Sequence, residues 1–462
     1  MKRAWHAALA ASAVALAVRL AVVAWAFRAF PPSADGTYYH KLAVRLAEGH
    51  GYTWAWPDGA VTYAAHYPVG YPAMMALGYA LFGAHPVVAM VQNALLGAAM
   101  TFAIHVLVAP LVSRGVHPRA PFVAALAVGL HPALVPYTAA LMTEGTTTAL
   151  LTIAAAIAAP PLEGTVSSAP PAGLGGRVSL RLLAAGITMG MATLVRPQSL
   201  VLAPVLGALA LAPSFTWRSR AAAAGAVLAV TLLCCAPWTL RNCVRMHRCS
   251  LVSVNAGWNL FIGEETHSGA WEEARFPEEC STVWDEAEKD VCLEGVARRR
   301  IREAPAAWLE KMPRKLAVTF DYFGAAPWYL HTANASAFSD RAKLALGTVE
   351  TVASRLLLVF ALTALALRPG PRRNLRRVTG LLGVVLALSP IGWLAYLVLA
   401  LLAAEAALAE PSGTVLFGWT AAVIAATAAT HAAFFGAGRY GLVVVPFVTA
   451  LAALNLRRPS RS

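Results

Sequence analysis

Five ionisable side chains stand where long apolar stretches begin or end, and together they could catalyse transfer of a group from an anionic carrier. Two are carboxylates and three are arginines: Asp35, Glu144, Arg196, Arg241 and Arg439. A carboxylate can remove a proton from an attacking hydroxyl, and a guanidinium can hold a phosphate through paired hydrogen bonds. Ionisable residues at membrane depth are costly to bury, so their presence there indicates function.

Each of these residues also has a structural interpretation. Asp is a favoured N-cap, so Asp35 could cap the helix that follows it, and Glu144 could cap the next apolar stretch in the same way. Arg196 and Arg439 could anchor helix ends at the membrane interface, because long cationic side chains extend toward headgroups. Arg241 could cap the C-terminus of a helix. No single residue decides between these interpretations, whereas their order along the chain is more informative.

The composition is that of a polytopic α-helical membrane protein. Of the 462 residues, 58% are hydrophobic and 13% are charged, and the mean hydropathy is +0.59. A soluble protein would carry about a quarter charged residues. Apolar runs of about 20 residues recur, which is the length that spans a bilayer. These runs are continuous rather than alternating, so a transmembrane β-barrel is not expected.

The net charge of +14 does not indicate a nucleic-acid-binding protein, because much of the excess lies in short segments between the apolar runs. Such a distribution is typical of cytoplasmic loops. By contrast, 13 of the 23 acidic residues fall between Glu264 and Glu310. We therefore predict that both termini are cytoplasmic and that the acidic segment lies outside.

We expect about 12 membrane spans, with a range of 10 to 13. They are placed at about 7–27, 86–108, 120–137, 144–160, 179–195, 197–213, 221–239, 342–367, 378–390, 391–409, 413–433 and 440–456. The chain then divides into an N-terminal transmembrane module (1–239, including the outer loop 28–84), an outer domain (240–341) and C-terminal transmembrane helices (342–462). Residues 160–178, rich in Pro, Gly and Ser, are expected to form a cytoplasmic linker.

The outer segments contain two local patterns. Leu42, Ala43, Leu46 and Ala47 lie on one face of an amphipathic helix that starts at Asp35. A helical pattern also covers about 282–317. Four of the six cysteines fall in the outer domain, which indicates disulfides in an oxidising compartment. Four cysteines allow three connectivities, and we prefer Cys243–Cys249 with Cys280–Cys292.

Several short motifs follow one another in a characteristic order. They are Asp35 with Tyr39 and Gly51-Tyr52, Tyr67–Pro72, Leu141–Glu144, Leu194–Pro197, Pro237–Asn242, Val254–Gly263 and Arg439-Tyr440. In this order the chain resembles the protein O-mannosyltransferase and lipid A aminoarabinose transferase group. These are membrane glycosyltransferases of the GT-C type that use polyprenyl-phosphate sugars. The resemblance implies many membrane helices, two juxtamembrane helices in the first outer loop, and Asp35 as the catalytic carboxylate.

Residues and resemblance together predict an inverting glycosyltransferase in a bacterial inner membrane, with its active site facing the periplasm. Asp35 would be the general base, and Glu144 would orient the acceptor or an arginine. The predicted substrate-binding residues are Tyr39, Tyr67, Tyr71, Arg196, Arg241, Asn259, Arg439 and Tyr440. Among them, Arg241 and Arg439 are the main phosphate ligands, Arg196 is a weaker one, and Tyr67 and Tyr71 wall the cavity.

The expected partners are a polyprenyl-phosphate sugar as donor, membrane lipids, and a protein, lipid or glycan as acceptor, with no nucleic acid. No nucleotide-binding loop is present, in keeping with a lipid donor. No cofactor is required by the sequence, although Asp35 and Glu144 could hold a divalent cation. Two alternatives stay open: a flippase or transporter of lipid-linked sugars, which would need the arginines but no base, and a non-catalytic assembly subunit.

Overall fold

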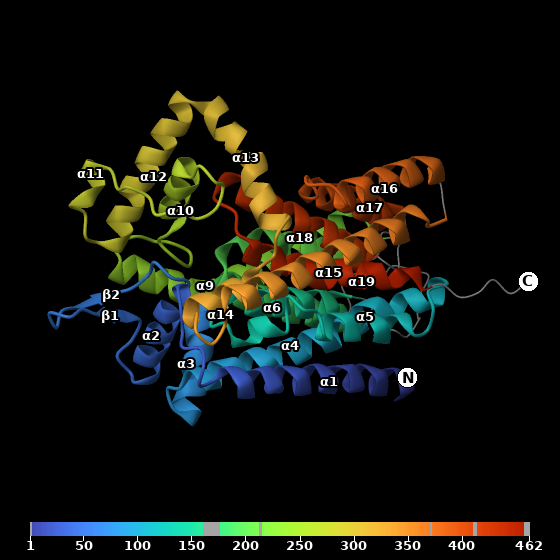
Figure 1. Ribbon diagram of the computed structural model, residues 1–462, viewed down its shortest axis with the longest axis horizontal. Helices are drawn as coiled ribbons and strands as arrows, with labels where there is room; N and C mark the ends of the chain where they lie inside the picture. Colours follow the sequence, from blue (N-terminus) through green and yellow to red (C-terminus); the bar gives the residue numbers. More distant parts are fainter. Residues whose placement is uncertain (1, 160–175, 212–214, 370–371, 410–413, 457–462) are drawn as a thin grey trace, which may run out of the picture.

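The protein is a bundle of long α-helices with a smaller polar segment at one end, as its computed structural model shows (Figure 1). The structure describes residues 2–159, 176–211, 215–369, 372–409 and 414–456. Within these ranges it has 19 α-helices, five short 3-10 helices and one two-stranded sheet. The N-terminus lies at the opposite end of the bundle from α2, the strands and α10–α12 (Figure 1). The predicted all-α polytopic architecture is confirmed at this level.

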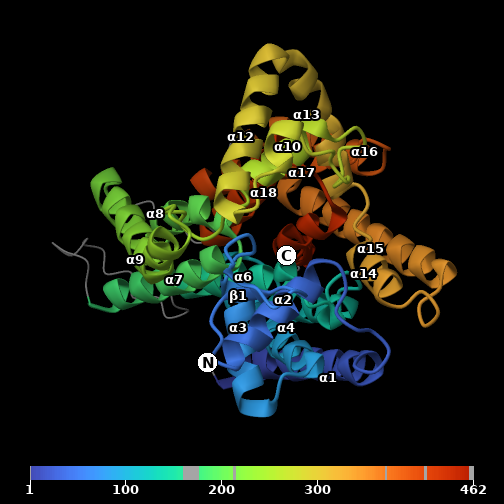
Figure 2. The ribbon, with the colours of Figure 1, turned by 90° about the vertical axis from the view of Figure 1, so that its left-hand side faces the viewer.

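Seven apolar helices in the described ranges are long enough to cross a membrane. Five are single α-helices, three of which begin one to three residues before the apolar stretch, and the other two combine an α-helix with one or two 3-10 helices. The elements are α1 (Lys2–Ala26), α4 (Pro86–Val108) with η1 (Ala109–Arg114), α7 (Gly176–Val195), α9 (Trp217–Arg245), α15 (Asp340–Ala366), α18 (Thr414–Ala433), and η4 (Gly438–Val444) with α19 (Val445–Ala452) and η5 (Ala453–Asn455). Figure 2 shows α7–α9 on one side of the bundle and α14–α15 on the other.

The other five predicted spans fall on shorter helices, so the number of crossings stays a prediction. These helices are α5 (Ala120–Gly129), α6 (Thr143–Ala158), η3 (Pro197–Leu202) with α8 (Ala203–Leu209), α16 (Arg373–Ala387) and α17 (Trp393–Ala409). The span expected at 120–137 is α-helical only as far as Gly129, and a separate 3-10 turn, η2 (Pro136–Ala139), follows it. Proline cannot donate to a helical hydrogen bond, and here Pro132 and Pro136 follow in quick succession.

Residues 28–84, the predicted first outer loop, contain two helices with a hairpin between them, as expected. Helix α2 (Asp35–Ala47) buries Tyr39, Leu42 and Ala43, which confirms the amphipathic pattern. Strands β1 (Thr53–Ala55) and β2 (Val61–Tyr63) pair antiparallel, and α3 (Gly70–Phe82) leads back to the bundle. The hairpin turn includes Gly59 at φ 86°, a conformation that favours glycine.

Residues 256–320, here called the polar segment, form a helical unit with its own small core. Its helices are α10 (Ala256–Glu265), α11 (Glu278–Ser281), α12 (Glu286–Glu303) and α13 (Pro305–Phe320), and α14 (Ala325–Ala333) follows. Both preferred disulfides are present, Cys243–Cys249 and Cys280–Cys292. The helical pattern expected at 282–317 is two helices, because Pro305 starts a new one after Ala304. That the polar segment lies outside the membrane stays a prediction.

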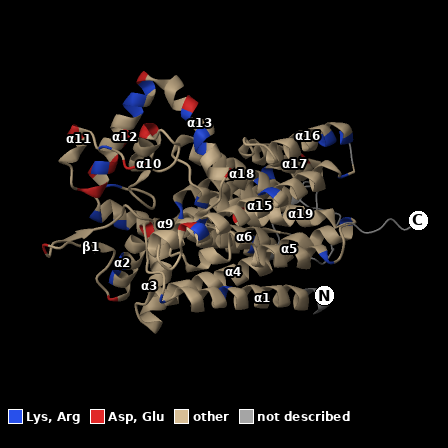
Figure 3. Ribbon diagram, viewed as in Figure 1, with Lys and Arg blue, Asp and Glu red and all other residues tan. Residues whose placement is uncertain are grey.

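Charges are distributed unevenly between the two ends of the molecule. Asp and Glu gather around α10–α12, and Lys and Arg are prominent near α5 and α16 at the opposite end (Figure 3). This is the asymmetry on which the predicted membrane orientation is based. Of the expected linker 160–178, all but the last three residues lie outside the described ranges, and those three belong to α7.

Candidate active site

Asp35 stands at the start of α2, where its carboxylate is free to form ion pairs. No side-chain hydrogen bond caps this helix, so the capping interpretation of Asp35 is wrong. The side chain is 34% exposed, and its Oδ2 accepts a hydrogen bond from Nη2 of Arg439 at 3.0 Å. Its Oδ1 faces the Tyr67 hydroxyl at 3.5 Å. Burial and the nearby Asp35 raise the pKa of Tyr67, so the hydroxyl stays protonated and can donate.

The backbone around Asp35 explains how the carboxylate reaches the bundle. Ala34 has φ 50° and ψ −134°, a strained conformation for a residue with a Cβ atom. At Gly36, a Cβ atom would lie 3.0 Å from the carbonyl oxygen of Leu141 and 2.9 Å from the Tyr329 hydroxyl. The start of α2 therefore packs directly against Leu141, in the segment that leads to Glu144.

Glu144 lies in the first turn of α6 and is only 2% exposed. Its Oε1 is 2.9 Å from Nη1 of Arg196 and 3.3 Å from Nε of Arg439. Its Oε2 accepts a hydrogen bond from the Tyr137 hydroxyl at 2.7 Å. No side chain caps α6, so capping is excluded for Glu144 too. A buried carboxylate with three such partners is held in one orientation.

Arg439 joins the two carboxylates although it is 404 residues from Asp35 in the sequence. It lies in η4, and its Nη2 also donates to the Tyr440 hydroxyl at 3.2 Å. Arg196 stands over the Tyr440 ring, 4.7 Å from its centroid. We call Asp35, Glu144, Arg196 and Arg439 the charged cluster. Its two anions and two cations come from four separate parts of the chain.

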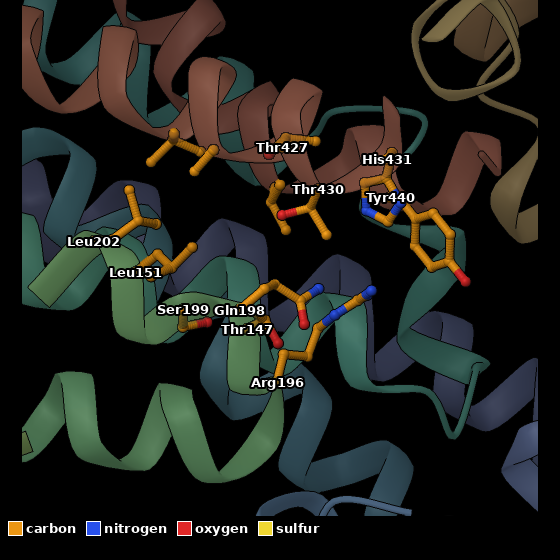
Figure 4. Close-up of a pocket in the computed structure, with 13 residues that line it drawn as sticks. Thr147, Leu151, Arg196, Gln198, Ser199, Leu202, Thr427, Thr430, His431 and Tyr440 are labelled. Atoms are coloured by element: carbon orange, nitrogen blue, oxygen red, sulfur yellow. The ribbon is translucent and has the colours of Figure 1, made fainter. Parts of the chain in front are cut away.

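A cavity with about 390 Å³ of empty space, open solvent included, borders the charged cluster between α6, η3, α18 and η4. Polar side chains gather at one end and apolar side chains at the other (Figure 4). Arg196, Gln198, Thr430, His431 and Tyr440 lie at the polar end and Leu151 and Leu202 at the apolar end, and Val423 and Val443 also line the cavity. Arg196, a member of the charged cluster, and Tyr440, which contacts it, both line the cavity. A ligand in the cavity would therefore meet a guanidinium.

Arg241 is not part of the charged cluster. Its guanidinium donates to the carbonyl oxygens of Ala64 at 2.8 Å and Tyr52 at 2.9 Å, and to Oδ1 of Asn242 at 3.0 Å. It also packs over the Trp238 ring, 4.8 Å from the centroid. Arg241 as a main phosphate ligand stays a prediction, and here its donors bond two main-chain carbonyl oxygens at the base of the hairpin and the side chain of Asn242.

Glu286 holds the same loop from the polar segment. Its Oε1 accepts from Nε1 of Trp54 at 2.6 Å, and its Oε2 accepts from the backbone N–H groups of Ala65 at 2.6 Å and His66 at 2.8 Å. The next residue, Tyr67, is the one that faces Asp35. Glu286 was missed from the sequence because it is one of 13 carboxylates in that stretch, and nothing local distinguishes it.

The remaining predicted residues separate into two groups. Tyr67 and Tyr440 contact the cluster, whereas Tyr39 is 6% exposed and supports Tyr67 with an edge-to-face ring contact at 5.1 Å. Tyr71 is fully buried with its hydroxyl 3.4 Å from Oδ1 of Asn93. Neither Tyr71 nor Tyr67, the two tyrosines predicted to wall the cavity, is among the residues that line it. Asn259 is half-buried on α10 in the polar segment, and none of its contacts among the described residues reaches the cluster.

Three further residues of the site were not predicted from the sequence. Tyr137 binds Glu144, His431 stacks on Tyr440 with 4.1 Å between ring centroids, and Gln198 faces Arg196. With its amide oxygen turned toward Arg196, Gln198 accepts from Nη2 at 3.0 Å and from Nε at 2.8 Å. The polar character of His431 inside an apolar run was the available signal for that residue.

In this arrangement the charged cluster leaves no open position for a divalent cation shared by Asp35 and Glu144. Arg439 already lies between Asp35 and Glu144, where a metal shared by the two carboxylates would stand. Across the described ranges, no group of three or more His, Cys, Asp or Glu residues could hold a metal ion. We therefore derive no catalytic step through a metal.

Comparison with known proteins finds no matching family model and no matching curated protein. Solved structures do match over nearly the whole chain. The archaeal oligosaccharyltransferase AglB from Archaeoglobus fulgidus, in complex with an inhibitory peptide and a dolichol-phosphate, is 14% identical, with 98% of this chain and 50% of that chain covered and a TM-score of 0.48. ArnT from Cupriavidus metallidurans, bound to undecaprenyl phosphate, is 15% identical, with 96% and 76% covered and a TM-score of 0.38.

Another Archaeoglobus fulgidus oligosaccharyltransferase structure, in complex with Zn and sulfate, is 15% identical with a TM-score of 0.46. The chain spans about half the length of the archaeal structures that it matches.

Proposed function

We propose that the protein transfers a monosaccharide from a polyprenyl-phosphate donor to an acceptor hydroxyl on the outer face of a bacterial inner membrane. The observation that carries this proposal is Arg439, which binds both Asp35 and Glu144 beside a cavity with one polar and one apolar end. A general base, a cation for a phosphate and an apolar wall for a lipid chain are thus adjacent.

The donor's phosphate would bind at the polar end of the cavity. A guanidinium can exchange a carboxylate partner for a phosphate without losing paired, charge-assisted hydrogen bonds. Arg196 lines the cavity and Arg439 contacts Arg196's partner Glu144, so both can turn toward the phosphate. The isoprenoid chain would follow the apolar lining toward the bilayer.

The chemistry is a displacement at the anomeric carbon of the sugar. The acceptor oxygen forms a bond to that carbon, the bond from that carbon to the phosphate oxygen breaks, and the acceptor's proton passes to Asp35. Attack from the side opposite the leaving group inverts the anomeric configuration. Base catalysis of this kind contributes about 10²–10⁴-fold in rate. The arginines stabilise the phosphate as it leaves with its additional negative charge.

Asp35→Asn in proteoliposomes supplied with a radiolabelled polyprenyl-phosphate sugar tests the proposal. The variant keeps the shape of the side chain and removes the base, so we expect donor binding to persist and transfer to fall by at least about 10²-fold. Asp58→Asn is the matched control, because Asp58 lies in the exposed hairpin turn and only bonds the backbone N–H of Ala60.

Two other outcomes would replace the proposal. If Asp35→Asn still moves the lipid-linked sugar across the bilayer, and the wild type does so without forming a glycosidic product, the protein is a flippase or transporter. If cells with Asp35→Ala and Glu144→Ala combined keep wild-type glycan levels, the protein is a non-catalytic assembly subunit. Mass spectrometry of envelope glycans and glycoproteins with and without the gene would identify the acceptor class.

A further inference from the structure

A second cavity lies inside the helix bundle and is not used by the proposed function. Its empty space is about 180 Å³, open solvent included, and about 10 Å³ of it can hold the centre of a water molecule, which is room for one. Four polar side chains line it: His131 in the turn after α5, Ser354 on α15, Tyr396 on α17 and Thr449 on α19. The rest of its wall is apolar, with valines of η4 and α19 among the contributors.

Three polar atoms of this wall are buried without a protein hydrogen-bond partner in the described ranges. They are Nε2 of His131, Oγ of Ser354 and Oγ1 of Thr449. The three residues are 2%, 4% and 1% exposed. Buried polar atoms are nearly always bonded to protein or ordered water, so three unpartnered atoms on one cavity indicate a shared ligand.

The hydrogen-bonding pattern selects the chemistry of that ligand. Nδ1 of His131 accepts the backbone N–H of Ala133 at 3.1 Å, which places the ring proton on Nε2. The imidazole therefore presents a donor to the cavity, and the ligand has to accept from it. The hydroxyls of Ser354 and Thr449 can either donate or accept. A water molecule meets all three requirements, whereas a metal cation would face an N–H group.

We infer that this cavity is a water-binding site that joins the end of α5 to α15 and α19. A cavity of this kind holds water when it is polar and offers two to four partners, and this one offers at least three. Helix α19 follows directly on η4, which carries Arg439, and Val444 at the end of η4 also lines the cavity. The water therefore helps to hold η4 and α19, the segment that carries Arg439.

A halide ion is the alternative ligand that an experiment must separate from water. The buried Arg19 donates from Nη1 to the carbonyl oxygen of Gly129, two residues before His131, and its Nη2 has no protein partner in the described ranges. This cation could attract an anion to the neighbourhood. Occupancy of the site by a halide would depend on the halide concentration, whereas occupancy by water would not.

Isosteric substitutions test the inference by thermal unfolding of the full-length protein in detergent micelles. If water bridges the hydroxyls, Thr449→Val and Ser354→Ala should each lower the melting temperature by about 2 °C, because each removes a partner of the water. The double variant should lose less than the sum, since the first substitution already releases the water. The control is Thr420→Val, whose hydroxyl bonds the Leu416 carbonyl in its own helix and no other group in the described ranges.

Opposite results would overturn the inference. In a dry cavity the unpartnered hydroxyls destabilise the folded protein, so their replacement by apolar groups would raise the melting temperature. Strictly additive losses would show that the two hydroxyls share no ligand. A wild-type melting temperature that falls when chloride is replaced by gluconate, with no such fall in the double variant, would identify a halide instead of water.

A measurement on the wild type keeps the inference testable if the variants fail to fold. Radiolytic hydroxyl labelling modifies buried side chains that contact bound water. Tyr396 lines the cavity and is 1% exposed, and Tyr329 is equally buried with its hydroxyl bonded to the backbone N–H groups of Ser33 and Leu141. We expect labelling of Tyr396 at least severalfold above that of Tyr329. Equal labelling of the two tyrosines would contradict a water site.

Discussion

Two arginines near the same end of the bundle hold different kinds of partner. Arg439 binds the side chains of Asp35 and Glu144, and Arg241 binds the backbone carbonyl oxygens of Tyr52 and Ala64. A side-chain ion pair can be exchanged when an anionic substrate arrives. A bond to the main chain at the base of a hairpin cannot be exchanged without moving the hairpin. The first arrangement suits catalysis, and the second suits support.

The same contrast separates the carboxylates. Asp35 is one-third exposed and reaches one arginine and one tyrosine. Glu286 accepts three short hydrogen bonds from the loop that carries Tyr67, two of them from the main chain. The charged cluster is thus supported by a clamp, formed by Glu286 and Arg241, that fixes the loop beside it. Substitutions in the charged cluster should lower the rate of sugar transfer. Substitutions in the clamp should increase the mobility of the loop that carries Tyr67.

The largest difference is expected between Arg439→Gln and Arg241→Gln. Loss of Arg439 removes the group that stabilises the leaving phosphate, so sugar transfer should fall by about 10²–10³-fold. Arg241→Gln should reduce transfer by about tenfold or less, because it acts only through the position of the loop. Initial rates at saturating donor, measured in proteoliposomes, give both values. Equal losses in the two variants would remove the distinction between cluster and clamp.

Glu286→Gln should loosen the loop more than it slows the chemistry. Hydrogen bonds to a charged group contribute about 1.5–3 kcal/mol, so amide exchange at Ala65 and His66 should accelerate by about tenfold or more. Transfer should fall by about three- to tenfold through the displaced Tyr67. Hydrogen–deuterium exchange of residues 52–67 measures the first effect. The control is Glu288→Gln, an exposed carboxylate in the same helix, and similar exchange in both variants would count against the clamp.

The clamp should also weaken in acid through His66, whose ring lies between those of Tyr67 and Trp258. Burial lowers the pKa of His66, and the carboxylates of Glu286, Asp290 and Asp35 partly oppose that shift. Because the folded-state pKa is below the unfolded value of about 6.5, the stabilisation is complete above pH 6.5. It is lost as the pH falls through the folded-state pKa.

We therefore expect loop protection to be constant above pH 6.5 and to decrease below it. His66→Gln should remove this decrease, since glutamine does not gain a proton in this range. His50→Gln is the matched control, because His50 belongs to the same loop and its side chain is 57% exposed. Hydrogen–deuterium exchange of the loop measured from pH 5 to 8 tests this prediction. If protection in His66→Gln still decreases in acid, a group other than His66 causes the decrease.

The smallest effect is expected at Ala34, beside the charged cluster. Glycine accepts φ 50° and ψ −134° without the strain that a Cβ atom causes, so Ala34→Gly should stabilise the fold by about 1 kcal/mol or less. Ala47→Gly, at the end of α2, should destabilise it by a similar amount, because glycine is a poor helix former. Thermal unfolding of the two variants gives the signs. A loss of stability in Ala34→Gly would show that its backbone is not strained.

The helical architecture and part of the site were predictable because they depend on local patterns. Apolar runs separated by basic loops predict the helices, and the spacing of Leu42 and Ala43 predicts the buried face of α2. Asp35, Glu144, Arg196 and Arg439 were found since charge at the end of an apolar run is visible in the sequence. The proposed roles of these residues stay predictions.

The partners of these charges were decided by tertiary structure alone. Arg241 and Arg439 are the same residue type in similar local settings, and only the folded chain brings one to main-chain carbonyls and the other to two carboxylates. Tyr71 carries the same kind of motif signal as Tyr67, but its hydroxyl faces Asn93. Sequence determines which segments can be buried, because hydrophobicity is local. It does not reveal which distant groups will satisfy a buried charge, because that depends on packing between segments hundreds of residues apart.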